Sequence, residues 1–154
     1  MRYYLAYGSN LNIRQMGTRC PFANVVGSAM IEGYQLLYKG SKTGAYLTIE
    51  KGNGAVPVGV WAVTEADERA LDRYEGYPNF YYKETMVVEL DGEPVEAFVY
   101  IMHRNRCYGI PTREYVRVCS EGYDSWGFDR RFLDEAYRRS MEGTHGLSKV
   151  RKAI

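Results

Sequence analysis

The sequence has few of the residues that metal centres and disulfide frameworks require. It contains only three cysteines and two histidines among its 154 residues. Cys20, Cys107 and Cys119 are odd in number and show no C-x-x-C spacing, so they support neither a disulfide framework nor a zinc site. We therefore expect three reduced thiols, no metal and no other cofactor.

Long apolar runs and an excess of charge of one sign are also missing. No stretch approaches the roughly 20 apolar residues of a membrane-spanning helix, and the first residues begin a strand-like pattern instead of a signal peptide. The 20 Lys and Arg against 19 Asp and Glu give a net charge of +1, too small a field to hold nucleic acid or an anionic membrane. We expect a cytoplasmic protein that binds a small molecule, as a monomer or weak homodimer.

Tyrosine is the one residue type in excess, with 15 copies in the chain. Each ring needs its apolar body buried and its hydroxyl satisfied, which suits the lining of a small polar cavity. High β-propensity and surface positions would explain the same excess.

Seven segments show the alternation and the β-branched or aromatic enrichment of strands. They are Tyr3–Tyr7, Val25–Ile31, Tyr34–Tyr38, Ala45–Ile49, Val56–Val63, Tyr81–Leu90 and Pro94–Met102. Asp91-Gly92, between the last two, predicts a hairpin because both residues accept a positive φ.

Three further segments predict helices. A capping-box-like start at Thr64 opens a helix that ends near Glu75, before Gly76. Two more helices are expected over residues 111–122 and 129–141. The pattern predicts one α+β domain over residues 1–143, with six or seven mostly antiparallel strands curled into a small β-barrel, and a loosely held basic tail over 144–154.

The segment Tyr7–Leu11 is the first candidate for a binding site. It lies between the first strand and a short helical stretch, where a glycine lets the chain turn before Ser9 and Asn10. Such a helix start presents unpaired backbone N–H groups that suit a carboxylate or a phosphate. Ordinary N-capping by Ser9 or Asn10 explains the same residues.

The second candidate is Glu75, in the last turn of its predicted helix and among tyrosines. Aromatic walls that exclude water, and the negative end of the helix, would both raise the pKa of this carboxyl toward the range of a proton shuttle. A glutamate in a last turn can also be simply exposed, and Asp72 fits that interpretation better.

In combination, the Tyr7–Leu11 segment and Tyr74-Glu75-Gly76 resemble the γ-glutamylcyclotransferase-like family of small mixed-barrel enzymes. Tyr82, Tyr100 and Tyr115 occupy positions where that family carries tyrosines. The resemblance implies that Glu75 is the catalytic acid/base. It also implies a substrate-binding set made of Tyr7, Gly8, Ser9, Asn10, Leu11, Tyr82, Tyr100 and Tyr115.

The implied reaction converts γ-glutamyl amides or peptides to 5-oxoproline and a free amine or amino acid. A non-catalytic protein of the same fold that holds a small acidic ligand is the alternative. The aromatic stretch Tyr77–Tyr82 favours an apolar or extended leaving amine, although the sequence does not identify that amine.

Overall fold

The computed structural model describes the backbone of residues 1–153 and the side chains through Thr144. It has one five-stranded sheet in the order β2-β3-β1-β5-β4. The strands are β1 (Arg2–Ala6), β2 (Asn24–Lys39), β3 (Tyr46–Val63), β4 (Tyr81–Leu90) and β5 (Glu93–Met102). The helices are η1 (Ser9–Leu11), α1 (Ile13–Arg19), α2 (Glu65–Glu75), α3 (Arg113–Trp126) and α4 (Arg131–Ala153).

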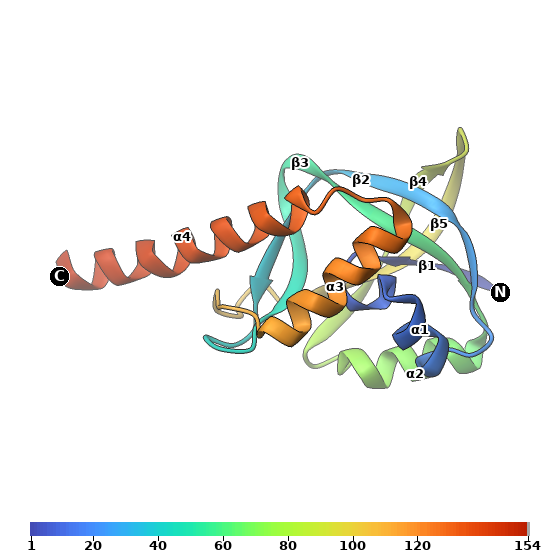
Figure 1. Cartoon of the computed structure of the whole chain (residues 1–154), viewed down its shortest axis with the longest axis horizontal. Coiled ribbons are helices and arrows are strands. Elements are labelled where there is room, and N and C mark those ends of the chain that lie inside the picture. The colour runs from blue at the N-terminus through green and yellow to red at the C-terminus, as the bar shows by residue number, and fades with distance from the viewer. Residues whose placement is uncertain (154) are drawn as a thin grey trace.

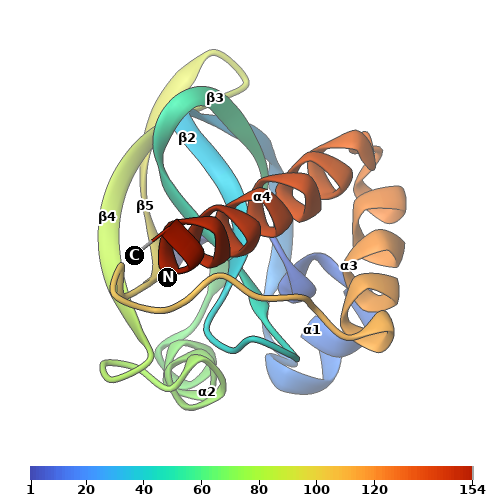
Figure 2. The ribbon, with the colours of Figure 1, turned by 90° about the vertical axis from the view of Figure 1, so that its left-hand side faces the viewer.

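The sheet is curled, but it is not a closed barrel (Figures 1 and 2). Within the described chain, no ladder joins the edge strands β2 and β4. The central strand β1 pairs antiparallel with β3 and parallel with β5, where Tyr4 lies opposite Phe98. The α+β class and the mostly antiparallel sheet are therefore confirmed, whereas the count of six or seven strands is wrong.

The count fails because four of the expected short strands are parts of two long ones. β2 continues through Gly33, which adopts a φ of +76° at a bulge, and β3 continues through Gly52 and Gly54. The glycines look like turns in the sequence, but an irregular ladder accommodates them as extra residues. The expected hairpin between β4 and β5 is confirmed, with a φ of 52° at Asp91 and 80° at Gly92.

The helix starts follow their capping residues. Thr64 accepts the Asp67 N–H, and the Asp67 carboxylate accepts the Thr64 N–H, which completes a capping box at the start of α2. Thr112 caps α3 in the same position. α3 does not end at Gly122, as the sequence suggested, but continues to Trp126.

Gly122 is a packing residue in the middle of α3. A Cβ at this position would lie 2.8 Å from the backbone nitrogen of Asn12 and 2.8 Å from the carbonyl carbon of Leu11. The glycine therefore lets α3 approach the backbone between η1 and α1 more closely than a side chain would permit.

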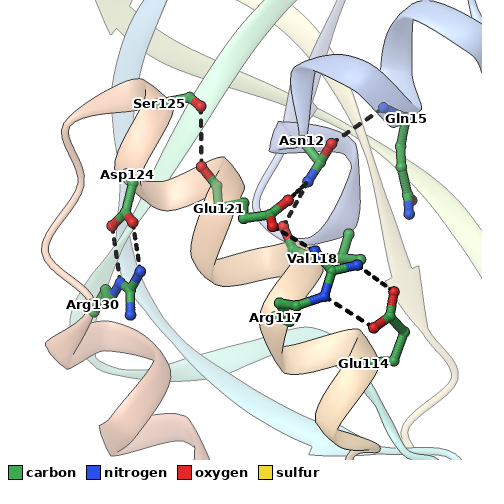
Figure 3. Close-up of polar contacts among 9 residues, drawn as sticks. All are labelled: Asn12, Gln15, Glu114, Arg117, Val118, Glu121, Asp124, Ser125 and Arg130. Atoms are coloured by element: carbon green, nitrogen blue, oxygen red, sulfur yellow. Dashed lines mark hydrogen bonds and ion pairs between the residues drawn. The ribbon is translucent and has the colours of Figure 1, made fainter.

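Side-chain contacts fix the same junction (Figure 3). The Asn12 side chain accepts the Gln15 N–H at 3.2 Å, and its Nδ2 donates to Val118 O at 3.0 Å and to Glu121 Oε2 at 3.2 Å. On the outer face of α3, Arg117 pairs with the Glu121 carboxylate as well. The segment that follows β1 is thus held in place by α3.

α4 begins against β2 and extends away from the sheet in its later turns (Figure 1). Ser140 Oγ accepts the Tyr38 N–H at 2.7 Å, and Leu133 and Ala136 are buried. The helix continues past the expected end at Met141. The side chains of 145–154 lie outside the described residues, so the loosely held basic tail stays a prediction.

Among the described residues, no helix has both the length and the apolar character that a membrane-spanning segment requires.

Candidate functional site

A cavity of about 330 Å³ opens between the end of α2, the start of η1 and the inner face of the sheet. Seven of its lining residues are tyrosines, and Glu75 is its only carboxyl among the described side chains. The lining consists of Tyr4, Tyr7, Gly8, Ser9, Tyr46, Leu47, Arg73, Tyr74, Glu75, Gly76, Phe80, Tyr81, Tyr100 and Tyr115. Nowhere in the described part of the chain do three potential ligands from His, Cys, Asp and Glu gather as a metal site.

Glu75 is placed in this cavity by the way α2 ends. Gly76 adopts a left-handed conformation with a φ of 64° and ψ of 38°, a conformation that glycine takes without steric cost. The helix stops there, and the half-buried Glu75 side chain lines the cavity. Burial raises the pKa of Glu75 to about 7, and the Arg19 guanidinium opposes part of that rise. This carboxyl can accept and return a proton near neutral pH.

The Asn10 amide contacts the Glu75 carboxylate from behind the cavity, and Tyr4 and Arg19 both contact that amide. Asn10 Nδ2 donates to Glu75 Oε1 at 3.4 Å and to the Tyr4 hydroxyl at 2.8 Å. Arg19 Nη1 donates to Asn10 Oδ1, which fixes the orientation of the amide. The Arg19 guanidinium also covers the Tyr74 ring, 3.4 Å from its centroid. Arg19 does not line the cavity, and no motif in the sequence indicated it.

Replacing Arg19 with Gln should move the pH dependence of any activity that needs ionised Glu75. The cation favours the charged carboxylate, so its loss should raise the pKa of Glu75 further. The acidic limb of the kcat/KM profile should then shift to higher pH, while Arg19→Lys should shift it less. An unchanged acidic limb in Arg19→Gln would show that Arg19 does not act on Glu75.

The segment Gly8–Leu11 forms a second part of the site. The N–H groups of Leu11 and Asn12 bond back to Gly8 O and Ser9 O, each at 3.0 Å. Within the described chain, no hydrogen bond uses the backbone N–H of Ser9 or Asn10. Ser9 Oγ lies 2.9 Å from the Tyr74 hydroxyl, which links this segment to the last turn of α2. Two free N–H groups and a hydroxyl can bind an anion close to Glu75.

The structure brings together most of the residues that the sequence singled out, but not all of them. Tyr7, Tyr100 and Tyr115 line the cavity, and Asn10 contacts Glu75 from behind. Leu11 does not line it: its side chain is fully buried in the core, and its carbonyl accepts the Trp126 Nε1–H at 2.8 Å.

Tyr82 is the other residue that the structure places elsewhere. Successive residues of a strand point to opposite faces, and on β4 it is Tyr81 that lines the cavity, with its hydroxyl donating to Leu47 O at 2.8 Å. Tyr82 packs on the other face, beside the His103 ring. Of this adjacent pair, the structure therefore places Tyr81 in the cavity and Tyr82, which the sequence analysis assigned to substrate binding, outside it.

Asp72 is a residue whose contacts the sequence did not reveal. Its Oδ1 accepts the Tyr100 hydroxyl at 2.6 Å and lies 3.0 Å from Lys83 Nζ. Burial and this bond to Asp72 raise the pKa of Tyr100. Asp72 is therefore not a freely exposed carboxylate, because it fixes the side chain of a cavity tyrosine.

The fold and the site define a small α+β protein with a half-buried carboxyl in a tyrosine-lined cavity. The chain belongs to the gamma-glutamyl cyclotransferase, AIG2-like family, whose model matches residues 4–122. No curated protein matches the chain.

Solved structures share the fold. A protein described as gamma-glutamyl cyclotransferase is 23% identical with a TM-score of 0.77, and the match covers 88% of this chain and 85% of that one. A Homo sapiens protein described as uncharacterized is 24% identical with a TM-score of 0.78, over 88% of this chain and 85% of its own. YkqA from Bacillus subtilis is 19% identical with a TM-score of 0.76, and the match covers 90% of this chain and 54% of YkqA. At these identities the likeness concerns the fold.

Proposed function

We propose that the protein is a cyclotransferase that converts γ-glutamyl amides or peptides to 5-oxoproline and a free amine or amino acid. Membership of the gamma-glutamyl cyclotransferase, AIG2-like family supports a cyclotransferase-type function. The observation that carries the specific reaction is Glu75, a carboxyl with a pKa raised to about 7, in a cavity beside a segment with two free backbone N–H groups.

The γ-glutamyl part of the substrate fits the inner end of the cavity. Its α-carboxylate would accept hydrogen bonds from the free N–H groups of Ser9 and Asn10 and from the Ser9 hydroxyl. This contact holds the α-amine and the γ-carbonyl carbon of one molecule within reach of Glu75. Because the nucleophile is tethered to its target, holding that geometry supplies several kcal/mol of the rate enhancement.

Glu75 then transfers a proton in each direction. The α-amine has an ordinary pKa of about 8 and is largely protonated at neutral pH, so ionised Glu75 first accepts one proton from the ammonium group. The amine nitrogen bonds to the γ-carbon, and the bond from that carbon to the leaving nitrogen breaks. Glu75 gives this proton to the leaving nitrogen as it departs. The attacking nitrogen loses its second proton when it becomes the lactam N–H, and Glu75 passes that proton to the released amine, which leaves as an ammonium ion. The carboxylate is thereby regenerated and the reaction balances.

Two tyrosine hydroxyls can stabilise the negative charge that develops on the γ-oxygen. Tyr4 Oη accepts a hydrogen bond from Asn10 Nδ2, and Tyr115 Oη accepts one from the Leu47 N–H at 3.1 Å. Each hydroxyl keeps its own proton to donate, and both residues line the cavity. Preorganised donors of this kind in a shielded site contribute strongly to catalysis.

The test of this function is the release of 5-oxoproline by the purified protein. A panel of γ-glutamyl amino acids, γ-glutamyl amines and γ-glutamyl-lysine should include substrates that yield 5-oxoproline together with an equal amount of free amine. Calorimetric binding of these compounds without any release would instead identify the protein as a non-catalytic binder of small acidic ligands.

A further inference from the structure

Three aromatic rings in contact with one another form one side of the cavity. The Tyr46 ring packs edge-to-face against the Tyr115 ring, with their centroids 5.2 Å apart, and against the Phe80 ring, with their centroids 6.3 Å apart. All three residues line the cavity, and the contacts between them are made by the rings. We call Tyr46, Phe80 and Tyr115 the aromatic wall.

One end of the aromatic wall lies beside the segment Gly8–Leu11. A Cβ on Gly8 would lie 3.3 Å from Tyr115 Oη, and the same hydroxyl accepts the Leu47 N–H at 3.1 Å. This hydroxyl is one of the two groups that we propose to stabilise the γ-oxygen. The γ-carbonyl of a bound substrate would therefore lie at the Tyr115 end of the wall.

The other end of the aromatic wall lies next to Glu75. The Phe80 N–H donates to Gly76 O at 2.8 Å, and a Cβ on Gly76 would lie 3.2 Å from Phe80 Cβ. Two further contacts fix the Phe80 ring. A Cβ on Gly40 would lie 2.7 Å from Phe80 Cζ, and the Arg106 guanidinium lies 4.6 Å from the centroid of the ring. Phe80 is therefore a preorganised apolar surface beside the proposed proton donor to the leaving nitrogen.

Tyr46 lies between these two ends and is open to solvent. It is 46% exposed although its ring contacts both Phe80 and Tyr115. In the proposed reaction the leaving nitrogen is bonded to the γ-carbon and receives a proton from Glu75, so its substituent starts between the two ends of the wall. A ring carried on a short chain from that nitrogen can pack on the exposed part of Tyr46.

We propose that the aromatic wall is the subsite for the leaving group, and that it selects γ-glutamyl amides whose amine carries an aromatic ring on a short chain. This inference rests on the proposed cyclotransferase function. A substrate ring on the wall would bury apolar surface and add a further aromatic pair to those already present.

The aromatic wall differs from the stretch on which the sequence analysis based an apolar leaving amine. Of Tyr77–Tyr82, only Phe80 and Tyr81 line the cavity. Tyr46 and Tyr115, which complete the wall, belong to β3 and α3. The subsite therefore depends on tertiary contacts between three distant parts of the chain.

Two substrates that differ only in a phenyl group test the proposal. γ-Glutamyl-phenethylamine and γ-glutamyl-ethylamine have the same γ-glutamyl part, the same amide and the same two-carbon chain. The wild-type protein should have a kcat/KM for the first about tenfold above that for the second. Because the wall holds the phenyl group before and during the reaction, the preference should lie in KM, with kcat values within about threefold of each other.

The variants compare loss of the Tyr46 ring with loss of an exposed ring elsewhere. Tyr46→Ala should lower kcat/KM for γ-glutamyl-phenethylamine about tenfold through KM, whereas the loss for γ-glutamyl-ethylamine should be below about threefold. Tyr46→Phe retains the ring and should retain the preference. Phe22 is 65% exposed and does not line the cavity. Phe22→Ala is therefore the control and should leave both substrates unchanged.

The outcomes separate this inference from the function on which it rests. Equal kcat/KM for both substrates in the wild-type protein, or equal losses for both in Tyr46→Ala, would overturn the aromatic subsite while the cyclotransferase function stands. Loss of the preference in Tyr46→Phe or in Phe22→Ala would also overturn it, because neither variant removes a ring of the wall. Absence of 5-oxoproline from every substrate of the panel would overturn the proposed function, and this inference with it.

Discussion

Glu75→Gln should abolish 5-oxoproline release while the protein still binds its substrate. Gln keeps the size of the side chain but can neither accept the ammonium proton nor return one to the leaving nitrogen. General acid/base catalysis contributes about 100-fold to 10,000-fold, and one residue carries both transfers here. We therefore expect turnover to fall by about 10,000-fold, measured as 5-oxoproline formation.

The fold and the binding step provide the controls for this variant. Because burial raises the pKa of Glu75 from 4.5 to about 7, ionised Glu75 opposes folding as pH rises through that value. Neutral Gln removes this unfavourable charge, so Glu75→Gln should be at least as stable as the wild type at pH 8. Calorimetric binding of a γ-glutamyl substrate should persist. A folded variant with more than about a tenth of wild-type turnover would rule out the shuttle, since that loss is below the range of such catalysis.

Gly122→Ala should destabilise the protein and weaken substrate binding together. The new Cβ would lie 2.8 Å from backbone atoms of both Leu11 and Asn12, and backbone cannot move aside as a flexible side chain can. Overpacking of this kind costs about 1 to 3 kcal/mol, which corresponds to a fall in Tm of roughly 5 to 10 °C at the upper end. Displacement of η1 should also raise KM, because the N–H groups that we propose to bind the α-carboxylate belong to Ser9 and Asn10.

Gly17→Ala is the matched control for that substitution. Gly17 also lies inside a helix, but a Cβ there would meet no atom within 4 Å. Alanine is the better helix former by up to about 1 kcal/mol, so Gly17→Ala should leave Tm unchanged or raise it. Thermal unfolding of both variants tests this comparison. Equal Tm values would mean that the close approach at Gly122 does not contribute to the stability of the protein.

The sequence predicts the elements of this fold better than their lengths. Capping at Thr64, the left-handed Gly76 and the Asp91-Gly92 hairpin depend on local chemistry, and the structure has each of them where the sequence suggests. The long strands were missed because a glycine at a turn and one at a bulge look alike. Only the pairing of β2 with β3, which depends on residues far apart in the chain, distinguishes the two cases.

The candidate site shows the same division between local and distant contacts. Glu75 could be proposed as a site residue because its position at a helix end among tyrosines, and the resemblance of its motif to that of the family, are visible in the sequence. Arg19 and Asp72 could not, because their partners Asn10 and Tyr100 reach them only through tertiary packing. Tyr81 lines the cavity and Tyr82 does not because adjacent residues of a strand lie on opposite faces of the sheet. A shift of one residue in strand register would reverse which of the two faces the cavity.

The parallel pairing of β1 with β5 has a consequence for synthesis in the cell. Tyr4 must wait for Phe98 before this ladder can form, and at about 5 to 20 residues per second the ribosome needs several seconds to supply the intervening chain. During that time the apolar strand β1 has only its β3 edge to pair with, and the segment that carries Ser9 lies apart from β5. The chain therefore acquires its affinity for the ligand late in translation. Substrate should not stabilise a nascent chain that is stalled before β5.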